Sequence, residues 1–433
     1  MRALVYGVPR PEGSAQPAPR DAFEGMLAAQ PFGLHDMPEP ELHAEDWVLT
    51  RPLLAGVCGS DSKLVLGDFA EGDIDNPMAA LSSLPCVPGH EVLAEVVKLG
   101  CAAEGFEIGG RVVLNPWLSC TPRNVSPPCP ACSAGDLSLC WSFTVGDIGP
   151  GVHIGVASGA PGGWAELMAA HDSMLIAVPG SVPDELAVLA DPFAVSLHSV
   201  LRHPPPAGGR AVVYGAGALG TTALAALKLL HPDVQVAVVA RFPAQAAMAR
   251  GLGADLVANH EPRLELVEQL AEWSGGVLHG ALGGLPMTHP GGIDVVYDTV
   301  GRPETLEVGV RVLASRGTLV QSGVHTPGRF EWTPVYFKEL TIAGSNAFGM
   351  EEIDGVRKHA IEHYLDFVAA GRLDLSGMLT HRFALEEWWD AVLALARQGE
   401  SDAIKVAFSP AAQGLTGVGN HPGGQQVATM SGK

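Results

Sequence analysis

Four cysteines within a 21-residue stretch are the strongest chemical signal in the chain. They are Cys120, Cys129, Cys132 and Cys140. Four thiolates with a Cys-x-x-Cys spacing among them can bind one tetrahedral zinc ion at about 2.3 Å each and fold the loop that carries them. Ordinary buried thiols would have no packing reason to gather in a Pro-rich loop. This stretch therefore predicts a structural zinc site.

A second set of possible ligands is chemically mixed. Cys58 lies in Gly-Val-Cys-Gly-Ser-Asp, His90 in Pro-Gly-His-Glu and Asp191 in Ala-Asp-Pro-Phe. A catalytic zinc site has few protein ligands and one open position, which Cys, His and carboxylate groups can supply. Each residue alone also fits an ordinary role, as a core cysteine, a turn histidine or a helix-capping aspartate. We take them together as candidates for a catalytic zinc site.

A glycine-rich turn follows the apolar strand 210–214 and opens a helix. In this position a G-x-G-x-x-G sequence lets the backbone approach a pyrophosphate, which then lies at the helix N-terminus. The turn predicts a dinucleotide site formed by Gly215, Gly217, Ala218, Leu219 and Gly220.

The end of the next predicted strand, 234–239, bears on the choice of dinucleotide. An acidic residue there would bind the ribose 2′-hydroxyl, but the sequence is Ala240-Arg241-Phe242. An arginine offers a planar set of donors to a 2′-phosphate. The sequence therefore favours NADP over NAD, although Arg241 could equally stack on adenine or face solvent.

Length and charge narrow the classes of protein. The 433 residues suggest two or three domains. The formal net charge of -21 repels nucleic acid and anionic lipid surfaces. No apolar run is long enough to cross a bilayer, and the first residues lack the features of a signal peptide. We expect a soluble cytoplasmic protein whose partner is a small molecule.

Hydrophobic patterning divides the chain near residue 190. The first part reads as short strands and long loops, and the second as strands alternating with helices around a parallel sheet. Strands are predicted at 92–99, 110–114, 210–214, 234–239, 293–297 and 317–323. Helices are predicted at 185–201, 219–230, 245–252, 303–313, 351–371 and 385–397. Loops are predicted at 9–43, 67–88, 116–151 and 275–292, and a disordered tail at 409–433.

These motifs, in this order, resemble the zinc-containing alcohol dehydrogenases of the medium-chain dehydrogenase/reductase superfamily. The resemblance runs from Arg2 to about Phe408. It implies an α/β fold in which a GroES-like, β-rich catalytic domain carries an inserted Rossmann domain with a doubly wound parallel sheet. The implied boundaries are 1–190 and 345–408 for the catalytic domain and 191–344 for the Rossmann domain. A homodimer or homotetramer with two zinc ions per chain is also implied.

The resemblance assigns roles to the candidate residues. Cys58 and His90 would bind the catalytic zinc, with Asp191 in the place of a Cys or Glu ligand. Glu91 would be a direct ligand or a carboxylate that moves onto the metal. Ser60 would begin a proton relay, and Asp61 would orient His90. Lys405 falls where the family places a basic residue toward the cofactor pyrophosphate.

Three positions depart from the family pattern. Ser126 stands where the fourth structural cysteine is usual, so Cys120 must reach in through a longer loop. Lys63 replaces the histidine that often ends the proton relay. The usual Gly-Asp-Arg-Val turn reads Gly109-Gly-Arg-Val112, so Gly110 replaces an expected acidic turn residue. Two rival functions therefore stay open, namely a zinc-free quinone or enoyl reductase and a non-catalytic zinc- and nucleotide-binding protein on the same scaffold.

Three further histidines and two tryptophans fit structural roles. His198 is expected to pack or cap a helix, and His359 and His363 to lie on an ordinary amphipathic face. Trp388 and Trp389 are expected in the core or in an interface.

Overall fold

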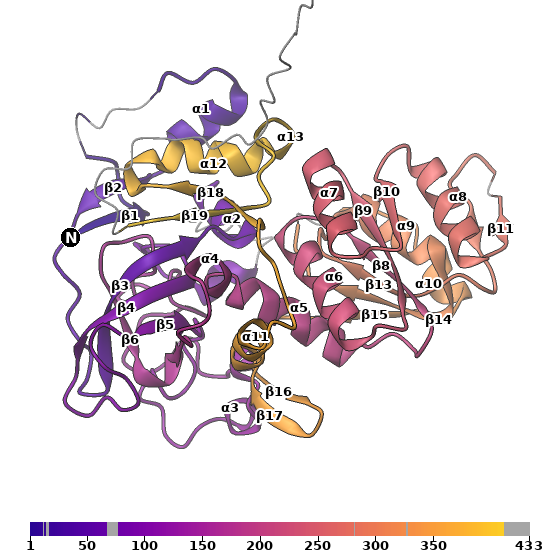
Figure 1. Cartoon of the computed structure of the whole chain (residues 1–433). Coiled ribbons are helices and arrows are strands. Elements are labelled where there is room, and N and C mark those ends of the chain that lie inside the picture. The colour runs from indigo at the N-terminus through magenta and orange to yellow at the C-terminus, as the bar shows by residue number, and fades with distance from the viewer. Residues whose placement is uncertain (12, 14–16, 67–76, 281, 326–327, 411–433) are drawn as a thin grey trace, which may run out of the picture.

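The molecule is built around two large sheets, with α5 (Ala190–Arg202) and α11 (Ala360–Ala369) between them (Figure 1). The structure is a computed structural model and describes residues 1–11, 13, 17–66, 77–280, 282–325 and 328–410. The predicted tail at 409–433 lies almost entirely outside these residues. None of the described helices is long and apolar enough to cross a membrane.

The first sheet is mixed and takes strands from both ends of the chain. Its order is β18-β19-β3-β4-β5-β7, with β6 paired to β3. The strands are β3 (Trp47–Gly56), β4 (Glu91–Leu99), β5 (Arg111–Leu114), β6 (Met168–His171), β7 (Leu175–Ala177), β18 (Leu379–Phe383) and β19 (Lys405–Phe408).

The second sheet is entirely parallel and has the order β10-β9-β8-β13-β14-β15. Chain order reverses between β8 and β13, as in a doubly wound fold, and ligands bind at such a switch point. The strands are β8 (Arg210–Tyr214), β9 (Gln235–Ala240), β10 (Leu256–Asn259), β13 (Ile293–Asp298), β14 (Leu313–Gln321) and β15 (Thr341–Gly344).

Helices cover both sheets and join them (Figure 1). They are α1 (Ala22–Ala29), α2 (Gly59–Val65), α3 (Pro130–Ala134), α4 (Asp184–Ala187), α5 (Ala190–Arg202), α6 (Ala218–Leu230), α7 (Pro243–Gly251), α8 (Arg263–Ser274), α9 (Pro303–Val312), α10 (Thr333–Phe337), α11 (Ala360–Ala369), α12 (Trp388–Ala396) and α13 (Gln398–Ser401). The predicted fold class is confirmed, while the exact domain boundaries stay predictions.

Two predicted helices differ from the observed ones. The segment 185–201 divides into α4 and α5, because Pro192 in one continuous helix would clash with the carbonyl of Val188 and lack a hydrogen bond. The segment 351–371 begins as a hairpin of β16 (Met350–Ile353) and β17 (Val356–His359). Asp354 and Gly355 both have positive φ, the conformation of a two-residue hairpin turn.

Three predicted loops contain regular structure. The segment 9–43 holds α1 and β2 (Phe32–Asp36), which pairs with β1 (Arg2–Tyr6). Asp21 caps α1 by accepting a hydrogen bond from the Glu24 amide at 2.9 Å. The segment 275–292 holds the short pair β11 (Leu278–His279) and β12 (Met287–Thr288). The segment 116–151 contains α3, and much of 67–88 lies outside the described residues.

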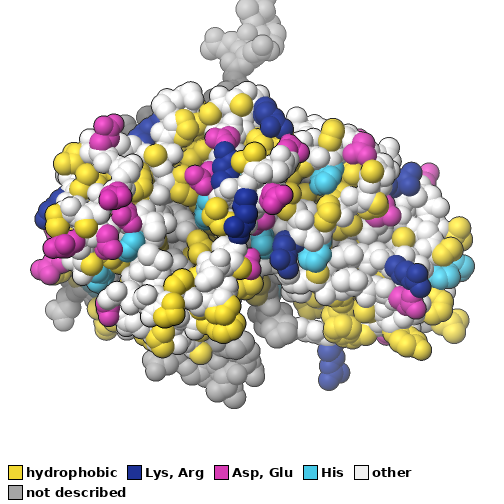
Figure 2. Space-filling view, turned by 90° about the horizontal axis from the view of Figure 1, so that it is seen from below, with side chains coloured by type: hydrophobic (Ala, Val, Ile, Leu, Met, Phe, Trp, Pro, Cys, Tyr) yellow, Lys and Arg dark blue, Asp and Glu magenta, His cyan; other side chains and the backbone are white. Residues whose placement is uncertain are grey.

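Charged and apolar side chains are interspersed on the face shown in Figure 2, with basic groups scattered among acidic ones. The expectation for Trp388 and Trp389 agrees with their burial in the core beside Phe32.

Arg123 organises the long loop that carries the cysteines. Its guanidinium is fully buried and donates to five backbone carbonyls at 2.7 to 3.1 Å. Those carbonyls belong to Leu118, Val145, Ile148, Gly149 and Gly151. A buried carbonyl without a hydrogen-bond partner is costly, so this one side chain lets two loop segments, around Leu118 and at 145–151, pack together.

Replacing Arg123 with methionine should destabilise this part of the molecule by about 3 kcal/mol or more, because several buried carbonyls lose their donor. Urea unfolding followed by tryptophan fluorescence would measure the change. The exposed Arg250→Met variant of α7 is the control and should stay within about 0.5 kcal/mol of the wild type. Equal stability of the two variants would contradict this role of Arg123.

Candidate metal and cofactor sites

Strand register brings the mixed set of ligands together. Gly56, the last residue of β3, pairs with Glu91 at the start of β4, and Ala407 of β19 pairs with Gly56 from the other side. Cys58 therefore follows β3 at the same edge where His90 precedes β4. The ligand atoms of Cys58, His90 and Glu91 all lie within 4.8 Å of one another. One thiolate, one imidazole and one carboxylate form a donor set that fits zinc.

Asp61 fixes two members of this group. Its Oδ1 atom lies 3.3 Å from His90 Nδ1, and its Oδ2 atom accepts a hydrogen bond from the Cys58 amide at 3.0 Å. Burial alone would raise the pKa of Asp61, but His90 and the Cys58 amide hold it below its usual value. A charged Asp61 keeps the His90 ring oriented, with its other nitrogen available as a ligand.

Lys405 forms a buried ion pair with Glu91. Its Nζ atom also donates to the Val57 carbonyl at 3.1 Å. Although burial lowers the pKa of Lys405, the Glu91 carboxylate raises it above the usual value. A Cβ on Gly56 would lie 2.2 Å from Glu91 Oε2, so only glycine leaves room for this pair. The predicted contact of Lys405 with the pyrophosphate stays a prediction.

Asp191 lies beside the group but not within it. It is buried in the first turn of α5, and its oxygens do not belong to the set within 4.8 Å. Burial, reinforced by Glu91, raises its pKa to about 7 against the opposing effects of His90 and Lys405. Of the two carboxylates expected as possible ligands, Glu91 belongs to the group with Cys58 and His90, and Asp191 does not.

His153 is a neighbour of the group that the sequence analysis missed. Its ring centroid lies 4.5 Å from that of His90, and burial together with His90 lowers its pKa to about 3. His153 also lines a cavity of about 80 Å³ with Ser60, Asp61 and Ser82. No spacing rule links His153 to the possible ligands Cys58, His90 and Glu91, because a loop brings it beside them.

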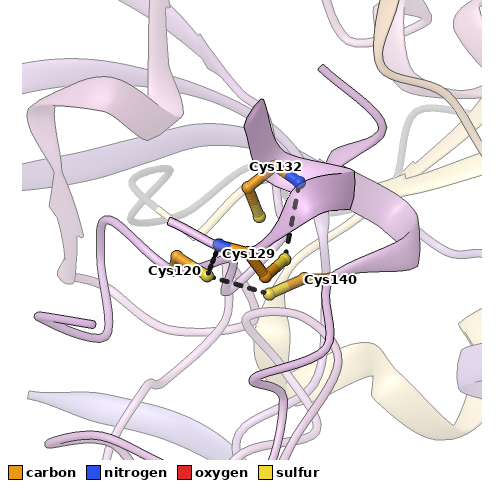
Figure 3. A group of neighbouring side chains, drawn as sticks. All are labelled: Cys120, Cys129, Cys132 and Cys140. Atoms are coloured by element: carbon orange, nitrogen blue, oxygen red, sulfur yellow. Dashed lines mark hydrogen bonds between the residues drawn. The ribbon is translucent and has the colours of Figure 1, made fainter. Parts of the chain in front are cut away.

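The four sulfur atoms of Cys120, Cys129, Cys132 and Cys140 converge from one loop and α3 (Figure 3). They all lie within 4.8 Å of one another, with 3.6 Å between Cys120 Sγ and Cys140 Sγ. Cys120 thus reaches the group despite its distant position in the sequence. Four sulfur donors at this separation fit a closed zinc site.

Backbone amides support these sulfur atoms. The Cys129 amide donates to Cys120 Sγ at 3.3 Å, and Ser142 donates to Cys140 Sγ at 3.2 Å. Burial alone would raise the pKa of Cys129, but amides of Trp141 and Cys132 lower it to about 6. Such hydrogen bonds favour the thiolate, which is the form that binds metal.

The three glycines of the α6 turn have different surroundings. Gly215 has a φ of +97°, and a Cβ on Gly220 would lie 1.9 Å from the Gly215 carbonyl oxygen. A Cβ on Gly217, the N-cap of α6, would meet nothing within 4 Å. Gly215 and Gly220 therefore serve the turn and its packing, whereas Gly217 leaves open space where a pyrophosphate could approach. Ala218 and Leu219 begin the helix.

Arg241 follows β9 and is exposed. Its guanidinium lies 5.1 Å from the ring centroid of Phe242, so a neighbouring aromatic ring supports it at the carboxyl end of the strand. This end of the parallel sheet is where a dinucleotide ribose is bound in doubly wound folds.

His198, His359 and His363, expected in structural roles, take part in helix contacts. His198 Nδ1 lies 2.5 Å from Glu351 Oε1, and His363 Nε2 donates to the Glu351 carbonyl at 3.1 Å. His359 is the N-cap of α11. Within the described part of the chain these residues form no group of three possible metal ligands.

Comparison with known proteins identifies the class. Residues 44–180 match the alcohol dehydrogenase GroES-like domain, and residues 218–369 match the zinc-binding dehydrogenase domain. The chain belongs to the zinc-containing alcohol dehydrogenase family of the medium-chain dehydrogenase/reductase superfamily. It is an NAD(P)-dependent oxidoreductase of the alcohol and polyol dehydrogenase type.

Individual relatives are similar over nearly their whole length. The chain is 26% identical over 392 residues to (R,R)-butanediol dehydrogenase of Saccharomyces cerevisiae, covering 87% of this chain and 94% of that protein. It is 24% identical over 381 residues to sorbitol dehydrogenase of Bacillus subtilis, with the same coverage. The crystal structure of galactitol-1-phosphate dehydrogenase from Escherichia coli has a TM-score of 0.69, 20% identity, and coverage of 95% of this chain and 100% of that chain.

Replacing Gly217 with alanine should weaken binding of the dinucleotide about tenfold, because the added methyl group enters the space left for the pyrophosphate. Fluorescence titration with NADP and NAD would measure this effect. Gly251→Ala in α7 is a matched control, since its Cβ would also meet nothing within 4 Å. Unchanged cofactor affinity in the Gly217→Ala protein would contradict the assignment.

Proposed function

We propose that the protein oxidises a polyol or a related secondary alcohol to a carbonyl compound and catalyses the reverse reduction. The observation that carries this proposal is the convergence of Cys58, His90 and Glu91 within 4.8 Å, beside Ser60 and a cavity. The relatives named for butanediol and sorbitol support a substrate with more than one hydroxyl group.

Cys58, His90 and Glu91 would hold the catalytic zinc ion, with Asp191 available beside them. When bound, zinc lowers the pKa of a substrate hydroxyl and polarises a carbonyl, while the nicotinamide exchanges hydride. Ser60 lines the cavity next to this group and would accept the hydroxyl proton, passing it toward the cofactor ribose and water. Asp61 keeps His90 in one orientation throughout.

We further propose two zinc ions per chain, the second held by Cys120, Cys129, Cys132 and Cys140. For the cofactor, exposed Arg241 and the absence of a carboxylate at residues 240–242 favour NADP. A homodimer or homotetramer is proposed as well. It is supported by the exposed apolar side chains of α10, which directly precedes edge strand β15, including Tyr336, which is 87% exposed.

Replacing Cys58 with alanine should lower kcat/KM at least a thousandfold, about 4 kcal/mol of transition-state stabilisation, because the metal loses its thiolate. The assay would use NADP and NAD with a panel of polyols, diols and simple alcohols. Metal analysis should find two zinc ions in the wild type and about one in this variant.

Cys101→Ala is the control for that experiment, because Cys101 is exposed and lies outside both groups. It should retain full activity and both zinc ions. A metal-free wild type that reduces quinones or enones would instead support the zinc-free reductase, and cofactor binding without any turnover would support the non-catalytic protein.

Replacing Arg241 with alanine should raise the KM for NADP about tenfold and leave the KM for NAD within about twofold, because only the 2′-phosphate loses a charged donor. Steady-state kinetics with both cofactors would separate these effects. Equal changes for the two cofactors would show that Arg241 does not select between them.

A further inference from the structure

His153 has one ring nitrogen committed to the backbone and one left to accept a hydrogen bond. Its Nδ1 atom lies 2.6 Å from the Ile154 carbonyl oxygen. A carbonyl can only accept, so Nδ1 carries the proton and Nε2 of the neutral ring carries the lone pair. The indole Nε1 of Trp117, a neighbouring donor, makes no hydrogen bond and so does not occupy this acceptor.

The ring of His153 is held in place from two sides. The backbones of Trp117 and His153 form an antiparallel bridge, and their rings meet edge to face at a centroid distance of 5.8 Å. On the other side the ring packs against His90 at 4.5 Å. A ring with so little freedom can orient a ligand without a large loss of side-chain entropy.

His153 lies beside His90 but is not one of the three possible metal ligands Cys58, His90 and Glu91. It borders the same cavity as Ser60, but it is not among the residues whose ligand atoms lie within 4.8 Å of one another. Of the other polar residues in the wall, Asp61 already contacts His90 and the Cys58 amide, and the Ser82 hydroxyl donates to the Ala79 carbonyl. The remaining side chains of the wall are apolar. A polar group of the substrate that enters this space has His153 as a nearby acceptor.

We infer that His153 is a specificity-determining residue that accepts a hydrogen bond from a second hydroxyl group on the carbon next to the reacting one. The contact between the His153 and His90 rings places this acceptor beside the reacting centre, so the group that it binds belongs to the adjacent carbon. The substrate class is then a vicinal diol, or the matching α-hydroxy ketone in reduction. This inference rests on the proposed function and narrows it.

The test compares 2,3-butanediol with 2-butanol, which have the same carbon skeleton and differ by one hydroxyl group. In the wild type the diol should have the higher kcat/KM. His153→Phe keeps an aromatic ring but removes the acceptor, and should lower kcat/KM for the diol about 10- to 100-fold. The value for 2-butanol should stay within about threefold. Most of the loss should appear in KM, because the hydrogen bond positions substrate rather than moving its proton.

A conservative variant and a binding measurement separate this role from a structural one. His153→Gln retains an acceptor and should recover part of the preference for the diol. Calorimetric titration of 2,3-butanediol into each enzyme with bound cofactor should show affinities that decrease from the wild type to His153→Gln and then to His153→Phe. His279→Phe, which makes the same replacement at an exposed histidine of β11 outside this cavity, is the matched control and should keep the wild-type preference.

The outcomes distinguish this inference from the proposed function. A wild type that oxidises both alcohols, with a His153→Phe variant that slows both equally, would overturn the role of His153 alone. An altered pH profile with unchanged discrimination would also overturn it, in favour of proton transfer. A wild type that prefers 2-butanol would exclude the diol subsite, and one that oxidises no alcohol would overturn the function and the inference together.

Discussion

The pairing of β3 with β4 and β19 is the constraint on which the group of Cys58, His90 and Glu91 depends. Three segments far apart in sequence must lie in one register for Cys58, Glu91 and Lys405 to meet. Because side chains alternate across a strand, a slip of one residue would turn the Glu91 side chain to the opposite face. The buried ion pair of Glu91 with Lys405 adds to this specificity, since either charge alone would be costly to bury.

The same pair also shapes the chemistry of the group. Lys405 offsets part of the negative charge that the carboxylates of Glu91 and Asp61 place around His90, and a water-exposed cation would do so less strongly. Burial, reinforced by Glu91, raises the pKa of Asp191 to about 7, although His90 and Lys405 oppose this shift. The carboxylate in contact with Lys405 and the one without such a contact are therefore not equivalent as metal ligands, although both lie near His90.

Much of the fold and of the candidate site was predictable because it rests on local patterns. The glycine turn after β8 and the Cys-x-x-Cys pair each carry their signal within a few residues. The hairpin at Asp354 and Gly355 had such a signal as well, but the apolar periodicity of the following helix obscured it. Arg123 and His153 could not be predicted, because their partners are backbone carbonyls and rings that only loop packing brings near.

The cysteine-bearing loop has a structural consequence beyond its own stability. The Met350 amide donates to the Gly135 carbonyl at 3.0 Å, so the β16–β17 hairpin is attached directly to the end of α3. Glu351 of this hairpin then contacts His198 of α5, the helix whose first turn carries Asp191. A metal ion bound by the four cysteines would therefore support the hairpin, which contacts the helix that borders the group of Cys58, His90 and Glu91. In this arrangement a structural metal would contribute to activity by holding α5 in position, with no contact to the substrate.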